Sequence, residues 1–181
     1  MEGSLRMSRK PFFSHPVIRT FVVRFFLVFF AVELLLFLFP PLGYQEWIAT
    51  QIGNLLHVPV NETFLLVNES WFEISAFCSG FTTLALFAGL VLGFNIPDWA
   101  TKVRFLMEGG LLIFLLNFIR IYFVVWVGVN YSFAAAETFH ILSWFALSGM
   151  ILWMWMELMK KETRTMNAGE LARYLVGNQS R

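Results

Sequence analysis

The sequence predicts an all-α integral membrane protein, a four-transmembrane-helix bundle with an outward-facing loop that contains a short interfacial helix and a β-hairpin. Apolar residues make up 58% of the 181 residues and the mean hydropathy is positive, whereas soluble domains are less apolar. Four apolar runs are long enough to cross a membrane, and twelve of the thirteen Lys and Arg residues lie where cytoplasmic segments would carry them. We expect one membrane-embedded domain over residues 1–181.

The first apolar run, residues 17–39, has the length of a transmembrane helix. At about 1.5 Å per residue it spans a hydrocarbon core of about 30 Å. It ends at Pro40 and Pro41, and no small-residue cleavage pattern follows it. We therefore expect a retained helix rather than a secretory signal.

The segment after the first run is expected to fold at the membrane surface. Residues 44–57 carry apolar side chains at helical spacing, with Trp47 as an anchor at the headgroup level, which predicts a short interfacial helix. Aromatic and β-branched residues then fill 63–67 and 71–74, on either side of a turn-forming triplet. This pattern predicts a β-hairpin whose second strand leads to Cys78.

Three further apolar runs each suit a single crossing, and they cover residues 76–94, 105–127 and 139–156. Four crossings place both termini on one side of the membrane. That side is cytoplasmic by the positive-inside rule, because segments 40–76 and 128–138 contain no Lys or Arg. The polar tail, residues 157–181, is then cytoplasmic.

Acidic residues inside the apolar runs need partners, because an unpaired charge in lipid is costly. Two such acidic residues are Glu33 and Glu108. We expect structural ion pairs for them, with Arg24 or Arg104 as the partner.

Composition excludes several classes of function. The net charge is +1 and the basic residues form no stripe, which argues against nucleic-acid binding. Cys78 is the only cysteine, so the chain has neither an internal disulfide nor a dithiol redox pair. The sequence contains no Gly-rich phosphate loop, and we expect no cofactor and no metal site.

The thirteenth basic residue, Arg120, lies inside an apolar run, and counting along the helices places two other reactive side chains at its depth. Sixteen residues separate Arg104 from Arg120, about 24 Å of helix. Cys78 lies seventeen residues from the inner end of its run, about 26 Å, and His140 lies twenty residues before Lys160, about 30 Å. Three helices therefore present Cys, Arg and His near the outer boundary.

These three residue types can perform acyl chemistry together. A nearby cation favours the nucleophilic thiolate, an imidazole carries protons, and a guanidinium stabilises a developing oxyanion. Asn117 and Glu137 each lie three residues before one of them, so they share a helical face and are candidate supports for the guanidinium of Arg120 and the imidazole of His140. Taken singly, each residue also fits a structural reading, such as a packing cysteine or a snorkelling arginine.

The order of these motifs resembles the exosortase and archaeosortase family of multi-pass membrane cysteine enzymes. The pattern is Cys-Ser-Gly at 78–80 opening one helix, Asn117-x-x-Arg120 on the next helix, and His140 on a third. The resemblance covers roughly residues 58–150. This chain departs from many larger members in having only four predicted helices.

The resemblance implies roles for the matching residues. Cys78 would be the nucleophile, Arg120 the stabiliser of thiolate or oxyanion, and His140 an acid, a base or an orienting group. Ser79 and Gly80 would support the nucleophile.

The resemblance also implies an activity and partners. The protein would be a membrane cysteine protease or transpeptidase that cleaves C-terminal sorting signals of exported proteins. Such a signal has a short motif, one transmembrane helix and a basic tail. The new carboxyl end would pass to an amine or lipid acceptor at the extracellular side of the cell membrane.

A non-enzymatic role is the alternative: a membrane assembly or anchoring subunit in which Arg120 pairs with an acidic residue of a partner helix. That role predicts that Arg120→Lys is tolerated and that Cys78→Ala is silent. An enzyme is damaged by both, because Lys does not reproduce the planar donor fork of Arg. A transporter is disfavoured because the chain shows no repeated halves.

Overall fold

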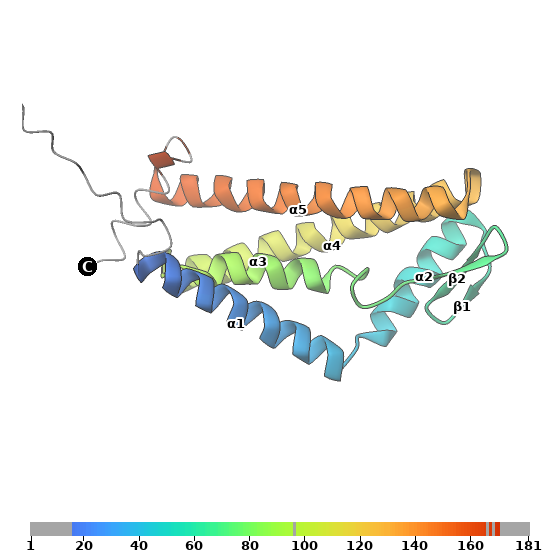
Figure 1. Ribbon diagram of the computed structural model, residues 1–181, viewed down its shortest axis with the longest axis horizontal. Coiled ribbons are helices and arrows are strands. Elements are labelled where there is room, and N and C mark those ends of the chain that lie inside the picture. The colour runs from blue at the N-terminus through green and yellow to red at the C-terminus, as the bar shows by residue number, and fades with distance from the viewer. Residues whose placement is uncertain (1–15, 96, 166, 168, 171–181) are drawn as a thin grey trace, which may run out of the picture.

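The computed structural model describes residues 16–95, 97–165, 167 and 169–170, and it is mostly helical (Figure 1). The basic residues expected before the first helix and the end of the polar tail, 171–181, lie outside the described residues. In chain order the elements are α1 (Pro16–Leu38), α2 (Leu42–Leu56), β1 (Val60–Asn61), β2 (Phe64–Val67), β3 (Ser70–Glu73), α3 (Phe81–Gly93), α4 (Trp99–Asn130) and α5 (Phe133–Thr163).

Three helices of the described chain, α1, α4 and α5, are long and apolar enough to cross a membrane. The fourth expected crossing is shorter than predicted. Residues 76–80 form turns, so α3 begins at Phe81 and contains 13 residues, about 20 Å of helix. By length alone α3 does not cover a hydrocarbon core of about 30 Å, and the expected bundle of four full-length crossings is corrected to three plus one shorter apolar helix.

Helices α4 and α5 extend beyond the apolar runs that predicted them, because capping residues set their starts. The Asp98 side chain accepts a hydrogen bond from the backbone N–H of Thr101 at 3.1 Å, and Ser132 does the same for Ala135 at 3.1 Å. Only Tyr131 and Ser132 separate the two helices, so α4 and α5 run antiparallel and pack along their length (Figure 1).

The short helix and the hairpin predicted after the first apolar run are both present. Helix α2 covers the residues expected at 44–57 with shifted ends, and β2 pairs antiparallel with β3. Asn68 and Glu69 connect these strands with positive φ angles of 46° and 65°, as a tight two-residue hairpin turn requires. A third short strand, β1, pairs with β2 and was not expected from the sequence.

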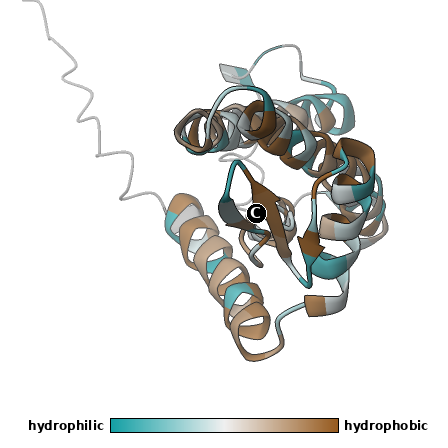
Figure 2. Cartoon of the chain, turned by 90° about the vertical axis from the view of Figure 1, so that its right-hand side faces the viewer, coloured by the Kyte–Doolittle hydropathy of each residue, from teal (hydrophilic) through white to brown (hydrophobic). Residues whose placement is uncertain are grey.

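Two apolar clusters hold the molecule together. One lies among α3, α4 and α5 around Phe87 and Ile113, and the other joins α2, the sheet and α4 around Ile52 and Leu65. Cys78 belongs to the second cluster. Figure 2 shows the hydropathy along the chain, viewed from the end that carries α2 and the sheet.

The expected ion pairs for the intramembrane acids are wrong. Arg24 donates a hydrogen bond to Asn95, and Arg104 lies 3.7 Å from Glu162. Both contacts join the helix ends that lie away from the sheet, which we call the basic end. Oε1 of Glu33 is buried and has no hydrogen-bond partner among the described residues.

Candidate active site

Cys78 lies on a tight turn between β3 and α3, not inside a helix as its apolar run suggested. Its backbone N–H donates to Ser75 O at 3.0 Å, and the Ser79 hydroxyl donates to Ala76 O at 2.5 Å. Gly80 then adopts a left-handed conformation with φ of 95° and begins α3. The turn therefore holds the cysteine at the N-terminal end of α3, where the helix dipole favours negative charge.

Asn117 fixes this turn from the neighbouring helix. Its Nδ2 donates a hydrogen bond of 2.7 Å to the carbonyl oxygen of Cys78, and its side chain is 1% exposed. A Cβ on Gly80 would lie 3.2 Å from Asn117 Nδ2. Asn117 thus donates to the backbone of Cys78, whereas the sequence suggested that this residue supports the Arg120 guanidinium.

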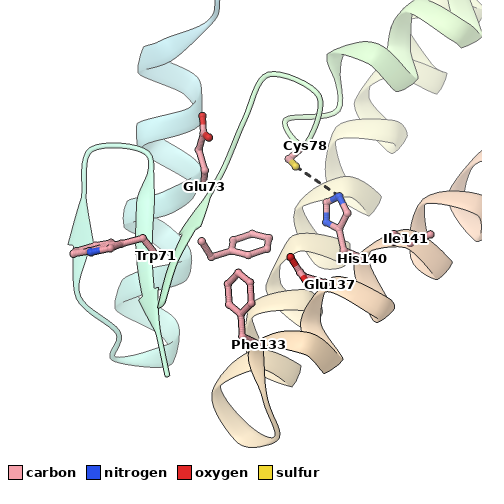
Figure 3. Close-up of a pocket in the computed structure, with 8 residues that line it drawn as sticks. Trp71, Glu73, Cys78, Phe133, Glu137, His140 and Ile141 are labelled. Carbon is pink, nitrogen blue, oxygen red and sulfur yellow. Dashed lines mark hydrogen bonds between the residues drawn. The ribbon is translucent and has the colours of Figure 1, made fainter. Parts of the chain in front are cut away.

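The cysteine faces a histidine from α5. Cys78 Sγ lies 3.8 Å from Nε2 of His140, a distance that suits a hydrogen bond to sulfur (Figure 3). The Ser75 hydroxyl lies 3.4 Å from the same sulfur and was not foreseen as part of the site. Phe72, on β3, packs edge-on against the His140 ring at 6.2 Å between centroids. The hairpin therefore helps to position the imidazole.

Arg120 is the third member of the cluster. It lies one helical turn beyond Asn117 on α4 and is only 7% exposed. Its Nε and Nη1 atoms are buried without a hydrogen-bond partner among the described residues. The guanidinium interacts electrostatically with Cys78 and with His140. The three residues predicted from depth counting therefore come together from the 75–80 turn, α4 and α5.

An open pocket of about 400 Å³ gives access to the thiol and the imidazole. Glu137 lies on its wall one turn before His140, and its role as a support for the imidazole stays a prediction. The remaining wall comes from the hairpin and the start of α5. Those lining residues are Trp71, Phe72, Glu73, Phe133 and Ile141 (Figure 3).

Sequence reasoning missed the aromatic wall of this pocket, although the signal was present. Phe72 lies within the strand predicted at 71–74, and alternate residues of a strand point to the same face. The strand pattern therefore indicated that Phe72 and Ile74 lie on one face of the hairpin. Placing Phe72 beside His140 also requires the sheet to pack on α5, which no local pattern indicates. In the described part of the chain, no group of three or more His, Cys, Asp or Glu residues is arranged to hold a metal ion.

The fold and the site together define an integral membrane protein with a thiol, an imidazole and a guanidinium gathered at one end of its helices. The family model described as transmembrane exosortase (Exosortase_EpsH) matches residues 11–158, and the chain belongs to this family. Neither the search of curated proteins nor the search of solved structures found a match.

Proposed function

We propose that this exosortase is a membrane cysteine transpeptidase that cleaves the C-terminal sorting signals of exported proteins and transfers the new carboxyl end to an amine or lipid acceptor. The single observation that supports this most strongly is the contact of 3.8 Å between Cys78 Sγ and His140 Nε2. A thiol beside an imidazole is the arrangement of an activated cysteine nucleophile.

The proposed chemistry proceeds through an acyl-enzyme. The thiolate of Cys78 attacks a backbone carbonyl carbon of the substrate, and the carbonyl oxygen gains negative charge. Arg120 stabilises that charge with N–H groups that have no partner among the described residues. The scissile C–N bond breaks, the leaving amine takes a proton with His140 as the candidate donor, and a thioester remains.

The second half of the reaction releases the product. The acceptor attacks the thioester carbon, loses a proton and expels the Cys78 thiolate. A site at the edge of the membrane restricts water, which favours transfer over hydrolysis. Cys78 itself is 9% exposed, which fits a nucleophile reached through a pocket rather than from bulk solvent.

The proposed orientation has both termini in the cytoplasm and the site on the extracellular side. The basic end carries Arg24, Lys102 and Arg104, whereas α2 and the sheet lie at the opposite end of the helices (Figure 1). The positive-inside rule assigns the first of these ends to the cytoplasm.

One observation also fits the alternative, a non-enzymatic membrane subunit. The unpartnered Nε and Nη1 atoms of Arg120 are available to an acidic residue of a partner helix. In that case Cys78→Ala changes nothing in the processing of exported proteins.

The test compares wild type with Cys78→Ala in cells that also express exported proteins from the same genome. We expect the C-terminal signal to be removed only with the wild type, as measured by the masses of the mature C-termini. Cys78→Ser is the matched variant, because it keeps a hydroxyl nucleophile of similar size but removes the thiol. Equal processing by wild type and Cys78→Ala contradicts the proposal.

A further inference from the structure

A second opening reaches His140 from the side of the helices. It is a pocket of about 390 Å³ lined by Phe77, Thr82, His140, Ile141, Trp144 and Phe145. It shares His140 and Ile141 with the pocket that contains Cys78. The imidazole is therefore accessible from two directions, one past the hairpin and one between helices.

This opening continues toward α1. A smaller cavity of about 180 Å³ is lined by Glu33, Leu36 and Phe37 of α1 and shares Phe77 and Thr82 with the first. We call the two together the lateral groove. The groove crosses the start of α3, with α1 on one side and α5 on the other. Helix α1 packs on α3, whereas α5 packs mainly on α4 (Figure 1).

The lateral groove contains two polar atoms without partners among the described residues. They are Oε1 of Glu33 and Oγ1 of Thr82, and both are buried. The other groove residues on α1 and α5 are mostly apolar or aromatic. Unsatisfied polar groups at membrane depth are costly and mark functional sites, so this pair calls for a hydrogen-bonding partner.

We propose that the lateral groove is the docking site for the transmembrane helix of the sorting signal, with Glu33 and Thr82 forming hydrogen bonds to a polar side chain of that helix. This inference rests on the proposed function. The groove reaches His140, which contacts Cys78. A substrate helix bound in the groove therefore places the segment that precedes its extracellular end beside Cys78.

The polar pair favours a helix over a lipid acyl chain as the occupant. An acyl chain fits the aromatic wall but offers no donor or acceptor to Glu33 or Thr82. The position of Glu33 along α1 also predicts where the polar residue lies in the substrate helix. Glu33 is five residues before Leu38, the end of α1, which corresponds to about 7.5 Å of helix. The partner side chain should therefore lie one to two turns inside the substrate helix.

Photo-crosslinking in membranes tests this directly. A photoreactive phenylalanine analogue replaces Phe77 or Trp144 in the Cys78→Ala background, which under the proposed function leaves the signal uncleaved. The probe is an exported protein with its C-terminal signal. Leu111, which is 75% exposed and outside the groove, is the matched control position. We expect crosslinks to the signal helix from 77 and 144 but not from 111. Crosslinks to lipid alone from the groove overturn the inference.

A second measurement addresses the polar pair. Glu33→Leu and Thr82→Val should each raise the KM for signal removal about threefold to twentyfold, the range for one interhelical hydrogen bond in a membrane. The rate of Cys78 alkylation should not change. Glu108→Leu is the control, because Glu108 is exposed and does not line the groove. An unchanged KM in both groove variants contradicts the assigned contacts.

The proposed transpeptidase activity and the proposed docking site in the lateral groove can be contradicted separately. If the wild type leaves signals uncleaved but the groove positions still crosslink to the signal helix, the chemistry is wrong and the docking site stands. If signals are cleaved but positions 77 and 144 do not crosslink, the docking site is wrong and the enzyme stands.

Discussion

The Asn117 side chain donates a hydrogen bond of 2.7 Å to the carbonyl oxygen of Cys78, and so links the 75–80 turn to α4. Arg120 lies one turn further along the same helix. A single helix therefore carries both the residue that holds the Cys78 turn and the buried cation, Arg120. Each member of this arrangement can be tested separately.

Replacing Asn117 with Ala should loosen the turn. The Cys78 carbonyl oxygen loses its buried donor, which costs about 1–3 kcal/mol, and the thiol is no longer held toward His140. We expect signal removal to fall by about tenfold to a hundredfold while membrane insertion persists. Asn130→Ala is the matched control, since Asn130 is exposed and donates to Trp126 within the same helix. Full activity in Asn117→Ala would show that the turn needs no such support.

Gly80→Ala should be damaging for two reasons. The φ of 95° is unfavourable for an L side chain, at a cost of about 1–2 kcal/mol, and the new Cβ would lie 3.2 Å from Asn117. We expect reduced signal removal and a lower melting temperature in detergent. Gly149→Ala, where nothing lies within 4 Å of an added Cβ, should leave both unchanged. Matching results for the two variants would contradict the role assigned to Gly80.

His140→Ala should slow the chemistry without unfolding the protein. The imidazole lies 3.8 Å from Cys78 Sγ and can carry a proton at neutral pH, and general acid–base groups contribute about 10²–10⁴-fold to rates. Because Cys78 is the only cysteine, alkylation by a thiol reagent reports on this sulfur alone, and we expect its rate to fall as well. His57→Ala provides the control, as His57 is an exposed residue at the end of α2. An unaltered alkylation rate in His140→Ala would remove the imidazole from the activation step.

Arg120→Lys separates the enzyme from a membrane subunit. Lys keeps the charge but loses the planar fork of donors, and removal of one oxyanion donor typically costs about 10²–10³-fold in kcat. We expect kcat for signal removal to fall on that scale. Arg104→Lys is the control, because Arg104 is exposed at the basic end and pairs with Glu162. A fully active Arg120→Lys enzyme would favour a simple charge-pairing role.

Local patterns predicted the helical membrane class, the short helix at 44–57 and the hairpin, because apolar runs and turn residues act over short stretches of chain. The family was suggested by the order of the Cys-Ser-Gly, Asn-x-x-Arg and His motifs. Local patterns misplaced the start of α3, since hydropathy continues through residues 76–80 whereas Gly80 breaks the helix there. The depth of Cys78 was therefore counted along a helix that does not exist at that point. The sequence nevertheless grouped Cys78 with Arg120 and His140, because all three lie near the same end of their elements.

Contacts between elements could not be predicted from local patterns. The bond from Asn117 to a backbone carbonyl depends on how α4 is placed relative to the 75–80 turn, and the packing of Phe72 on His140 depends on how the sheet is placed relative to α5. The lack of a partner for Oε1 of Glu33 among the described residues could not be predicted either, because its expected partner Arg24 donates to Asn95 instead.

The most direct test of the central claim is to measure the mass of the enzyme itself during turnover. Purified enzyme is mixed with an exported protein that carries its C-terminal signal, quenched in acid and analysed by intact-mass spectrometry, with and without hydroxylamine. We expect an acyl adduct on Cys78 of the wild type that hydroxylamine releases and that Cys78→Ala never forms. Signal removal by the wild type with no such adduct at any time, or the same adduct on Cys78→Ala, would contradict that claim.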